Sequence, residues 1–128
     1  MIKYIFFISL GGALGAPSRY YVSLLLNNFF NSSFPYGTFL VNIIGSLFIG
    51  IVVGSLKIFN YLDDFIFKYF LIIGFLGSFT TFSSFSLETI ELINKGYLGY
   101  SLTYIILSVI LNIIAAYIGI SLINFIFG

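Results

Sequence analysis

The sequence predicts an all-α integral membrane protein with four transmembrane helices, the third of them broken near the middle of the membrane. Of its 128 residues, 60% are hydrophobic and only 7% are charged, with a mean hydropathy of +1.15, whereas soluble domains are about a quarter charged. Since a spanning helix needs about 20 apolar residues, the length allows four spans and no extramembrane domain. We therefore expect residues 1–128 to form a single transmembrane domain.

Composition also excludes several classes of function. A net charge of +1 provides no basic surface for nucleic acid. Histidine and cysteine are both absent, which removes thiol chemistry, the usual zinc ligands and the commonest general base. No two carboxylates are placed as a pair at membrane depth; the four are Asp63, Asp64, Glu88 and Glu91. We expect this protein not to be an enzyme.

The first predicted span covers residues 3–26. Its apolar run continues to Leu26, which favours a retained span over a cleaved secretory signal. Gly11 and Gly15 have the four-residue spacing that lets helices approach closely. Pro17 should kink the helix or begin a new turn, and Arg19 is the only charge well inside the first two spans. Residues 27–35 are expected to form the first loop.

The second predicted span covers residues 36–56. Ser46, Gly50 and Gly54 recur every four residues down one of its faces, as in close helix packing. Asn42 is an amide among aliphatic residues, so it must find a hydrogen-bond partner or destabilise the fold by about 1 to 3 kcal/mol. A helix-to-helix hydrogen bond and a role in a polar path are both compatible with this residue.

The third predicted span covers residues 65–94 and is expected to break near residues 76–81. The stretch from Gly74 to Phe85 combines two glycines with five hydroxyl residues. In a membrane, non-helical backbone is tolerated only where it is buried in protein or lines a wet cavity. Half-helix ends and freed carbonyl groups at such breaks are known to bind ions. This stretch is therefore the first candidate for function.

The fourth predicted span covers residues 97–127. Tyr104, Ser108 and Asn112 recur every four residues and form a polar stripe. The stripe can serve either as hydrogen-bonding contact between helices or as a wet path. The lysines give only a weak orientation bias under the positive-inside rule, so the chain is compatible with insertion in both directions.

The aromatic residues of the third span allow two interpretations. Phe79, Phe82 and Phe85 are spaced by three and would usually be packing residues. Phenyl rings also have electropositive edges, which can replace water around a small anion beside hydroxyl groups. A proton-coupled small-cation or multidrug exporter of the four-span dimer type is the rival class. Such an exporter should carry an acidic residue inside a span, and the first two spans have none.

Three sequence blocks resemble the Fluc (CrcB) family of small fluoride ion channels. The resemblance spans the whole chain, and its most specific part is the TTFSSF block that follows a Gly-x-x-Gly pattern. The blocks are GGALGAPSRY at 11–20, PYGTFLVNIIGS at 35–46 and GFLGSFTTFSSFSLE at 74–88. The resemblance implies an antiparallel, dual-topology dimer in the bacterial inner (plasma) membrane, passive efflux of fluoride from the cytoplasm, and a structural sodium ion at the dimer centre.

The resemblance also implies roles for individual residues. Backbone carbonyls of Gly77 and Thr80 would bind sodium, and Arg19 would line a vestibule. The residues implied for the fluoride pore are Thr38, Asn42, Phe82, Ser83, Phe85, Tyr104 and Ser108.

Two positions depart from the family pattern, because Asn112 stands where a smaller hydroxyl residue is expected and Ser84 where threonine is commoner. Some family members pair two different subunits, so both a homodimer and a pairing with a homologous second subunit are compatible with this sequence. A structural assembly factor without transport activity is a third possibility.

Overall fold

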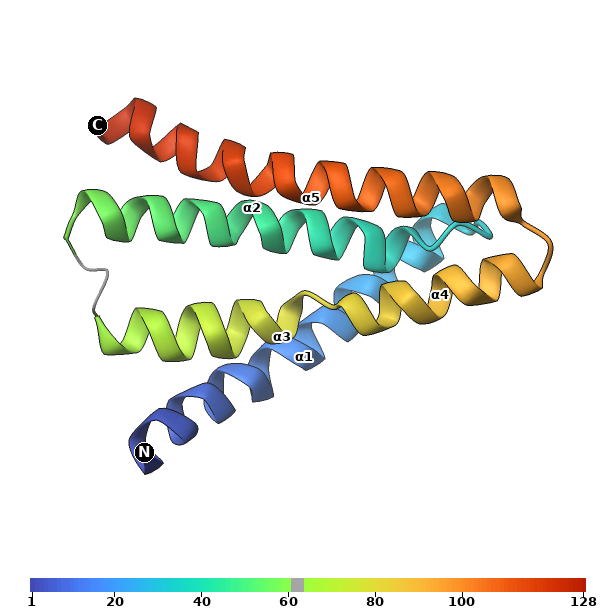
Figure 1. Cartoon of the computed structure of the whole chain (residues 1–128). Coiled ribbons are helices and arrows are strands. Elements are labelled where there is room, and N and C mark those ends of the chain that lie inside the picture. The colour runs from blue at the N-terminus through green and yellow to red at the C-terminus, as the bar shows by residue number, and fades with distance from the viewer. Residues whose placement is uncertain (61–63) are drawn as a thin grey trace.

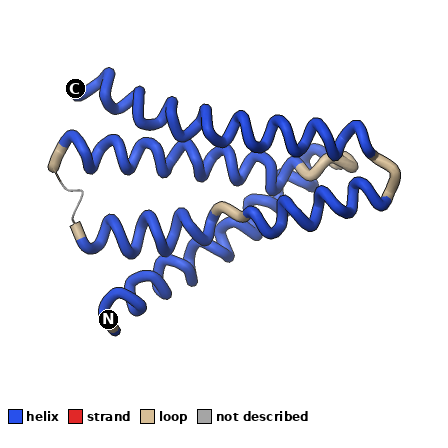
Figure 2. Tube along the Cα trace, viewed as in Figure 1, coloured by secondary structure: helices blue, strands red, loops and turns tan. Residues whose placement is uncertain are grey.

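The computed structural model describes residues 1–60 and 64–128, and every regular element within them is helical (Figures 1 and 2). The elements in chain order are α1 (Ile2–Phe30), α2 (Tyr36–Ile58), η1 (Ile66–Leu76), α3 (Gly77–Phe79), α4 (Phe82–Asn94) and α5 (Leu98–Phe127). The η1 segment is π-helical and continues directly into α3. The third predicted span therefore consists of η1, α3 and α4 together.

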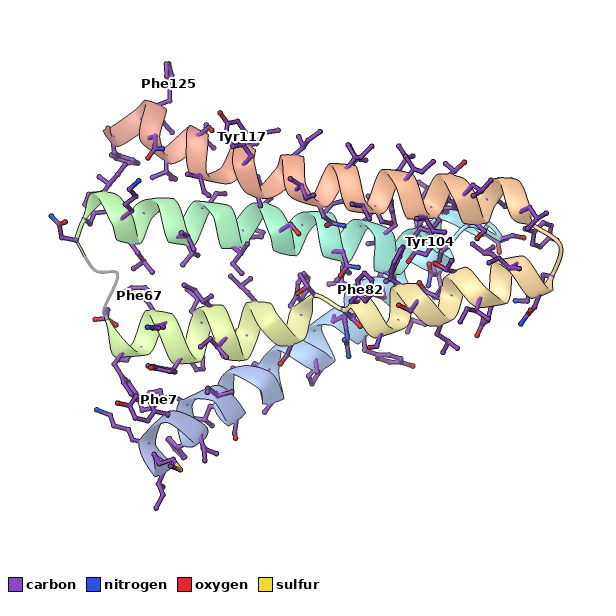
Figure 3. The ribbon with its side chains drawn as sticks, viewed as in Figure 1. Phe7, Phe67, Phe82, Tyr104, Tyr117 and Phe125 are labelled. Atoms are coloured by element: carbon purple, nitrogen blue, oxygen red, sulfur yellow. The ribbon has the colours of Figure 1, made fainter. Side chains whose placement is uncertain are left out.

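Three helical segments in the described ranges are long and apolar enough to cross a membrane: Tyr36–Ile58, Ile66–Asn94 and Leu98–Phe127. The 29-residue helix α1 is not in this set. Large apolar side chains cover the outside of the bundle, including Tyr117 (71% exposed) and Phe125 (89% exposed), which point away from α5 in Figure 3. An aqueous protein would bury such residues, so these surfaces fit a lipid environment and a multi-pass membrane protein.

Helices α2 and α5 run side by side in the same direction (Figure 1). Contacts along them keep a constant offset of 66 residues: Ser46 bonds to Asn112, and Gly50 lies against the backbone of Ala116. Gly54 similarly lies against Ile120. We call this line of contacts the α2–α5 seam. The glycines at the last two of these contacts allow the two backbones to approach closely without side chains between them.

Helix α1 packs against η1, α3 and α2. A side chain at Gly11 would overlap the backbone of Phe70 and Gly74, and one at Gly15 would overlap the carbonyl of Phe75. The prediction that these two glycines form a close packing surface is therefore confirmed. Pro17 lies inside an uninterrupted helix.

The third span loses its helical conformation at two residues. Thr80 (φ −82°, ψ 154°) and Thr81 (φ −151°, ψ 121°) are extended, and the helix resumes at Phe82. Thr81 caps the new helix, because its hydroxyl oxygen accepts the N–H of Ser84 at 3.2 Å. The interruption falls within the predicted range 76–81 at its C-terminal side, and Figure 2 shows it as a short loop.

Other boundaries differ from the sequence-based expectation. Helix α1 continues to Phe30, so the first four residues expected in the loop are helical, and Asn31 ends the helix in the left-handed conformation (φ 41°). No local sequence pattern predicted the π-helical geometry of η1. Asp64 accepts the N–H groups of Ile66 and Phe67 and so caps the third span. Asp63, also expected in the connecting loop, lies outside the described residues.

Candidate functional site

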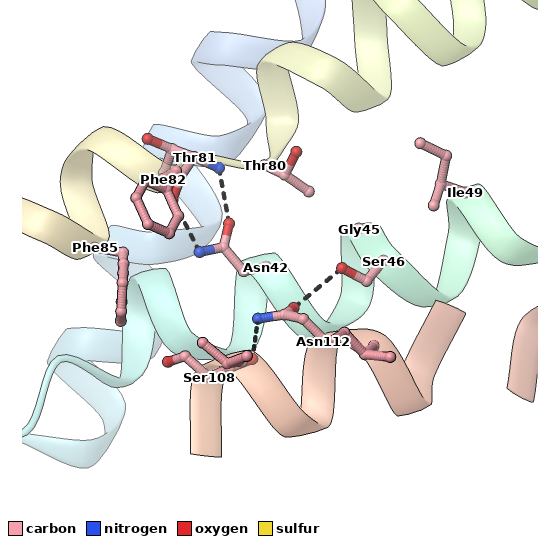
Figure 4. Close-up of a pocket in the computed structure, with 12 residues that line it drawn as sticks. Asn42, Gly45, Ser46, Ile49, Thr80, Thr81, Phe82, Phe85, Ser108 and Asn112 are labelled. Carbon is pink, nitrogen blue, oxygen red and sulfur yellow. Dashed lines mark hydrogen bonds between the residues drawn. The ribbon is translucent and has the colours of Figure 1, made fainter. Parts of the chain in front are cut away.

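A cavity of about 350 Å³ lies between α2, the interruption of the third span, and α5 (Figure 4). Its polar lining consists of hydroxyl and amide groups, and its apolar lining includes two phenyl rings. None of its lining residues within the described chain is charged. They are Asn42, Gly45, Ser46, Ile49, Thr80, Thr81, Phe82, Phe85, Ser108, Val109, Asn112 and Ile113.

The Asn42 side chain holds the interruption in place. Its Oδ1 accepts the N–H of Thr81 at 2.7 Å, and its Nδ2 donates to the carbonyl of Thr81 at 3.0 Å. Extended backbone inside a bundle leaves both groups without helical partners, and one amide satisfies both. The carboxamide keeps a second N–H, and the residue lines the cavity. Asn42 is thus both a clamp on the backbone and a potential donor to a ligand.

The same geometry frees two backbone carbonyls. In a continuous α-helix the N–H of Thr81 would bond to the carbonyl of Gly77, but it is donated to Asn42 instead. Likewise, the N–H that would reach the Thr80 carbonyl belongs to Ser84 and is donated to the Thr81 hydroxyl. Both carbonyls therefore lose their α-helical donor at the break and are suited to a hard cation.

Two phenyl rings line the cavity from the start of α4. The rings of Phe82 and Phe85 lie 5.1 Å apart at an angle of 48°. Phe85 is buried (7% exposed) and also contacts the Tyr104 ring at 5.0 Å, whereas Phe82 is 76% exposed. One ring is therefore fixed by the core of the protomer, and the other stands at its surface.

Ser108 provides a hydroxyl with no partner. Its Oγ is buried and forms no hydrogen bond with any group in the described part of the chain, although the residue lines the cavity. A buried hydroxyl without a partner is destabilising unless water or a ligand completes it. One turn further along α5, Asn112 donates to the Ser108 carbonyl at 2.6 Å and accepts from Ser46 at 3.0 Å.

A half-buried carboxylate on α4 lies beside the seam, where it meets residues one turn before Asn42 on α2 and one turn before Ser108 on α5. Glu88 accepts the hydroxyl of Thr38 at 2.6 Å and the hydroxyl of Tyr104 at 2.7 Å. Tyr104 is fully buried, and its ring contacts Phe85. This network ties α2, α4 and α5 together beside the cavity.

A second cavity of about 270 Å³ also borders Thr81, between α1, α2 and α4. Arg19, Asn27, Thr38 and Glu88 are among its lining residues, and Thr81 lines both cavities. The two spaces therefore meet at the interruption of the third span.

Most of the site residues predicted from the sequence line one of these two cavities or contact a residue that does. Asn42, Thr80, Phe82, Phe85 and Ser108 line the first cavity, Arg19 and Thr38 line the second, and Tyr104 lies behind Phe85.

Ser83 and Gly77 are not among the lining residues of either cavity. The Ser83 side chain is within hydrogen-bond distance of the Thr81 hydroxyl, 3.1 Å away. Gly77 can take part only through its backbone.

Sequence reasoning missed the roles of Glu88, Thr81 and Ser46. The bond between Glu88 and Thr38 could not be predicted, because 50 residues separate them and no local pattern links them. Thr38, Asn42 and Ser46 have the same four-residue spacing as Tyr104, Ser108 and Asn112, and this shared spacing is the signal that could have paired Ser46 with Asn112.

Among the described residues, no group of three or more acidic, histidine or cysteine side chains could hold a metal ion.

Comparison with known proteins assigns the chain to a family. Residues 6–120 match the family described as CrcB-like protein, Camphor Resistance (CrcB). A protein from Azobacteroides pseudotrichonymphae named "Fluoride-specific ion channel FluC" is 44% identical over 98% of this chain and 99% of its own length.

Similar proteins in other bacteria carry the same name. The one from Flavobacterium psychrophilum is 42% identical over 92% of this chain and 94% of its own. The one from Agrobacterium fabrum is 40% identical over 90% and 91%. The matches include the second span, the interruption and the fourth span, which together build the cavity. This chain belongs to the CrcB-like family of membrane proteins.

Proposed function

We propose that this protein is a fluoride-selective ion channel that lets fluoride leave the cytoplasm passively, across the inner (plasma) membrane of a bacterium. The observation that carries the proposal is the cavity between α2, the interruption and α5, which is lined by hydrogen-bond donors and phenyl rings and by no charged side chain of the described chain. The names of the relatives support fluoride as the permeant ion.

The lining suits a small, strongly hydrated anion. Such an ion must exchange its water for closely placed donors, and it must also leave again. The free N–H of Asn42 and the unpartnered hydroxyl of Ser108 can donate. The edges of Phe82 and Phe85 carry partial positive charge. A fixed cation in the cavity would bind the ion too tightly for rapid passage.

We further propose that the working form is an antiparallel dimer in which α1 is a fourth span. The exposed ring of Phe82 supports this, because it lines the cavity and yet stands at the surface of the protomer. A second subunit lying over this face would complete the wall of the cavity. Either a second copy or a homologous subunit would serve.

A structural sodium ion at the dimer centre is part of the same proposal. The freed carbonyls of Gly77 and Thr80 are hard oxygen ligands of the kind that hard cations prefer. Two subunits would together supply four such oxygens. The ion would offset the repulsion between carbonyl dipoles at the two breaks and hold the subunits together.

The second cavity is the proposed aqueous entrance. Arg19 would attract anions to it, and Thr38, Glu88 and Tyr104 would fix the walls between entrance and pore. Ser83 would act through its contact with Thr81 rather than as a direct ligand.

Fluoride efflux from liposomes, measured with a fluoride electrode, tests the proposal. Wild-type protein should release fluoride far faster than chloride. Phe85→Ile and Phe82→Ile should abolish most of this efflux, because an aliphatic side chain has no electropositive edge. Phe125→Ile, at an 89% exposed position of α5, is the control and should behave as wild type. Equal rates for chloride and fluoride would contradict the proposal.

Glu88 is a carboxylate within a span, which is a feature that a proton-coupled cation exporter would need. Both of its oxygens already accept hydroxyl hydrogens, which leaves it poorly placed to take a cation. Uptake of a cationic dye driven by a pH gradient in the same liposomes would favour the exporter. We expect no such uptake.

A further inference from the structure

One hydrogen bond of the α2–α5 seam joins two residues that line the cavity but that the proposed function leaves without a role. On α2, Asn42 and Ser46 are one helical turn apart, as are Ser108 and Asn112 on α5. Because the helices run in the same direction with an offset of 66 residues, Asn42 lies level with Ser108, and Ser46 lies level with Asn112 (Figure 4). The first pair faces the cavity with free donors, and the second pair is bonded together.

Asn112 is bound to both helices. Its Oδ1 accepts from the Ser46 hydroxyl at 3.0 Å, and its Nδ2 donates to the Ser108 carbonyl at 2.6 Å. An amide can bridge in this way because it offers a donor and an acceptor on different atoms. A serine at this position would be too short to reach both groups and would tend to bond to its own helix.

The other hydroxyls of this protein show what Ser46 and Ser108 would otherwise do. Five of them donate to the carbonyl four residues earlier in their own helix: Ser18, Ser55, Thr80, Ser86 and Thr89. Ser46 instead reaches across to Asn112, and the Oγ of Ser108 has no partner in the described chain. Thr38 is a further hydroxyl that bonds to another helix, where its partner is Glu88. Ser46 and Ser108 lie within one turn of each other along the cavity wall.

We infer that Asn112 is a positioning residue, and that its bond to Ser46 sets the separation of α2 and α5 at which the Asn42 amide and the Ser108 hydroxyl meet a small, hydrogen-bond-accepting anion. The inference rests on the proposed function, because it assigns an anion to the cavity. In this account Asn112 need not touch the ion. Asn112 acts by fixing the distance between the Asn42 amide and the Ser108 hydroxyl, which lie one helical turn away along the seam.

Exchanging the two residues of the bond gives the sharpest test. Asn112→Ser and Ser46→Asn each disrupt the bond, whereas the double variant places the amide on α2 and the hydroxyl on α5 and can restore it. Ser46→Ala removes only the interhelical bond and leaves the bond from Asn112 to Ser108. Ser55→Ala is the matched control, because Ser55 is another half-buried serine of α2 that bonds within its own helix.

Fluoride and chloride efflux are measured in liposomes for monodisperse protein. We expect Asn112→Ser and Ser46→Ala to lower fluoride efflux by roughly threefold to tenfold, because a hydrogen bond between membrane helices contributes only a small stabilisation. Both variants should also raise chloride efflux relative to fluoride efflux. The double exchange should recover most of the loss in both measurements. Ser55→Ala should match wild type. A residue with only a structural role would lower the folded yield without changing the ion ratio.

Wild-type rates and ratios in Asn112→Ser and Ser46→Ala would overturn the inference and leave the proposed function intact. A double exchange no better than Asn112→Ser alone would also overturn it, because it would indicate a direct ligand at position 112. Wild-type protein that passes no fluoride would instead overturn the proposed function itself.

Discussion

The two halves of the α2–α5 seam use the same four-residue spacing with different residues. In the half near the start of the two helices, Asn42 and Ser46 on α2 lie level with Ser108 and Asn112 on α5, and a cavity opens beside them. In the half near their ends, Gly50 lies against the backbone of Ala116, and the seam is closed.

The difference shows how one helix pair can both hold together and leave a polar space. Backbone contact through glycine gives close packing without any polar group to satisfy. Where side chains replace glycine, the helices are kept apart, and each polar atom needs a partner. The structure satisfies most of them internally but leaves the Ser108 hydroxyl without one. We therefore expect variants in the open half to change transport and variants in the closed half to change stability.

Asn42→Leu should have the largest effect. The substitution removes both hydrogen bonds to the Thr81 backbone and leaves two buried groups without partners. Leaving each of these groups unsatisfied destabilises the native conformation of the break by about 1 to 3 kcal/mol. Because this conformation forms the cavity wall, we expect fluoride efflux to fall by more than about a hundredfold. The efflux assay in liposomes checks this. Efflux within about tenfold of wild type would contradict the role of the clamp.

Gly50→Ala should destabilise the closed half. The added methyl group would meet the carbonyl oxygen of Ala116, which is backbone and can move only with its helix. Overpacking of this kind costs about 1 to 3 kcal/mol. Gly99→Ala is the matched control, because a methyl group there meets no atom within 4 Å. Equilibrium unfolding in detergent should separate the two variants, and equal stabilities would show that the seam is less tightly packed than the structure indicates.

Tyr104→Phe should have a smaller effect. It removes the hydrogen bond to Glu88 but keeps the ring that packs on Phe85. Hydrogen bonds between membrane helices are worth about 0.6 kcal/mol on average, so we expect a loss of this size in the free energy of unfolding. Tyr117→Phe, at a 71% exposed position of the same helix, should cause none. A double-mutant cycle with Thr38→Val would show whether the two hydroxyls act together on Glu88.

The sequence predicted the break in the third span because its cause is local. Glycine and hydroxyl residues between apolar segments cannot hide their backbone groups in lipid without a protein partner. The same reasoning marked Asn42 as an amide that must find a partner. It could not identify the backbone of Thr81 as that partner, since 39 residues separate them.

Other features depend on contacts that no local pattern reveals. The network of Thr38, Glu88 and Tyr104 joins three helices, so it exists only once the bundle has formed. The polar stripe on α5 was visible in the sequence, but not which of its members would remain unpaired. Ser108 and Asn112 looked alike in the stripe, and the structure separates them into an unpartnered hydroxyl and a bridging amide.

Ser108→Ala provides the most direct test of the claim that the open half of the seam carries the anion. Removing a hydroxyl that has no partner in the described chain should leave the stability of the folded protein unchanged or slightly raised. Fluoride efflux per folded protein should nevertheless fall severalfold, while Ser55→Ala retains the wild-type rate. Wild-type fluoride efflux in Ser108→Ala would contradict the account, because the unpartnered hydroxyl of the cavity would then have no part in transport.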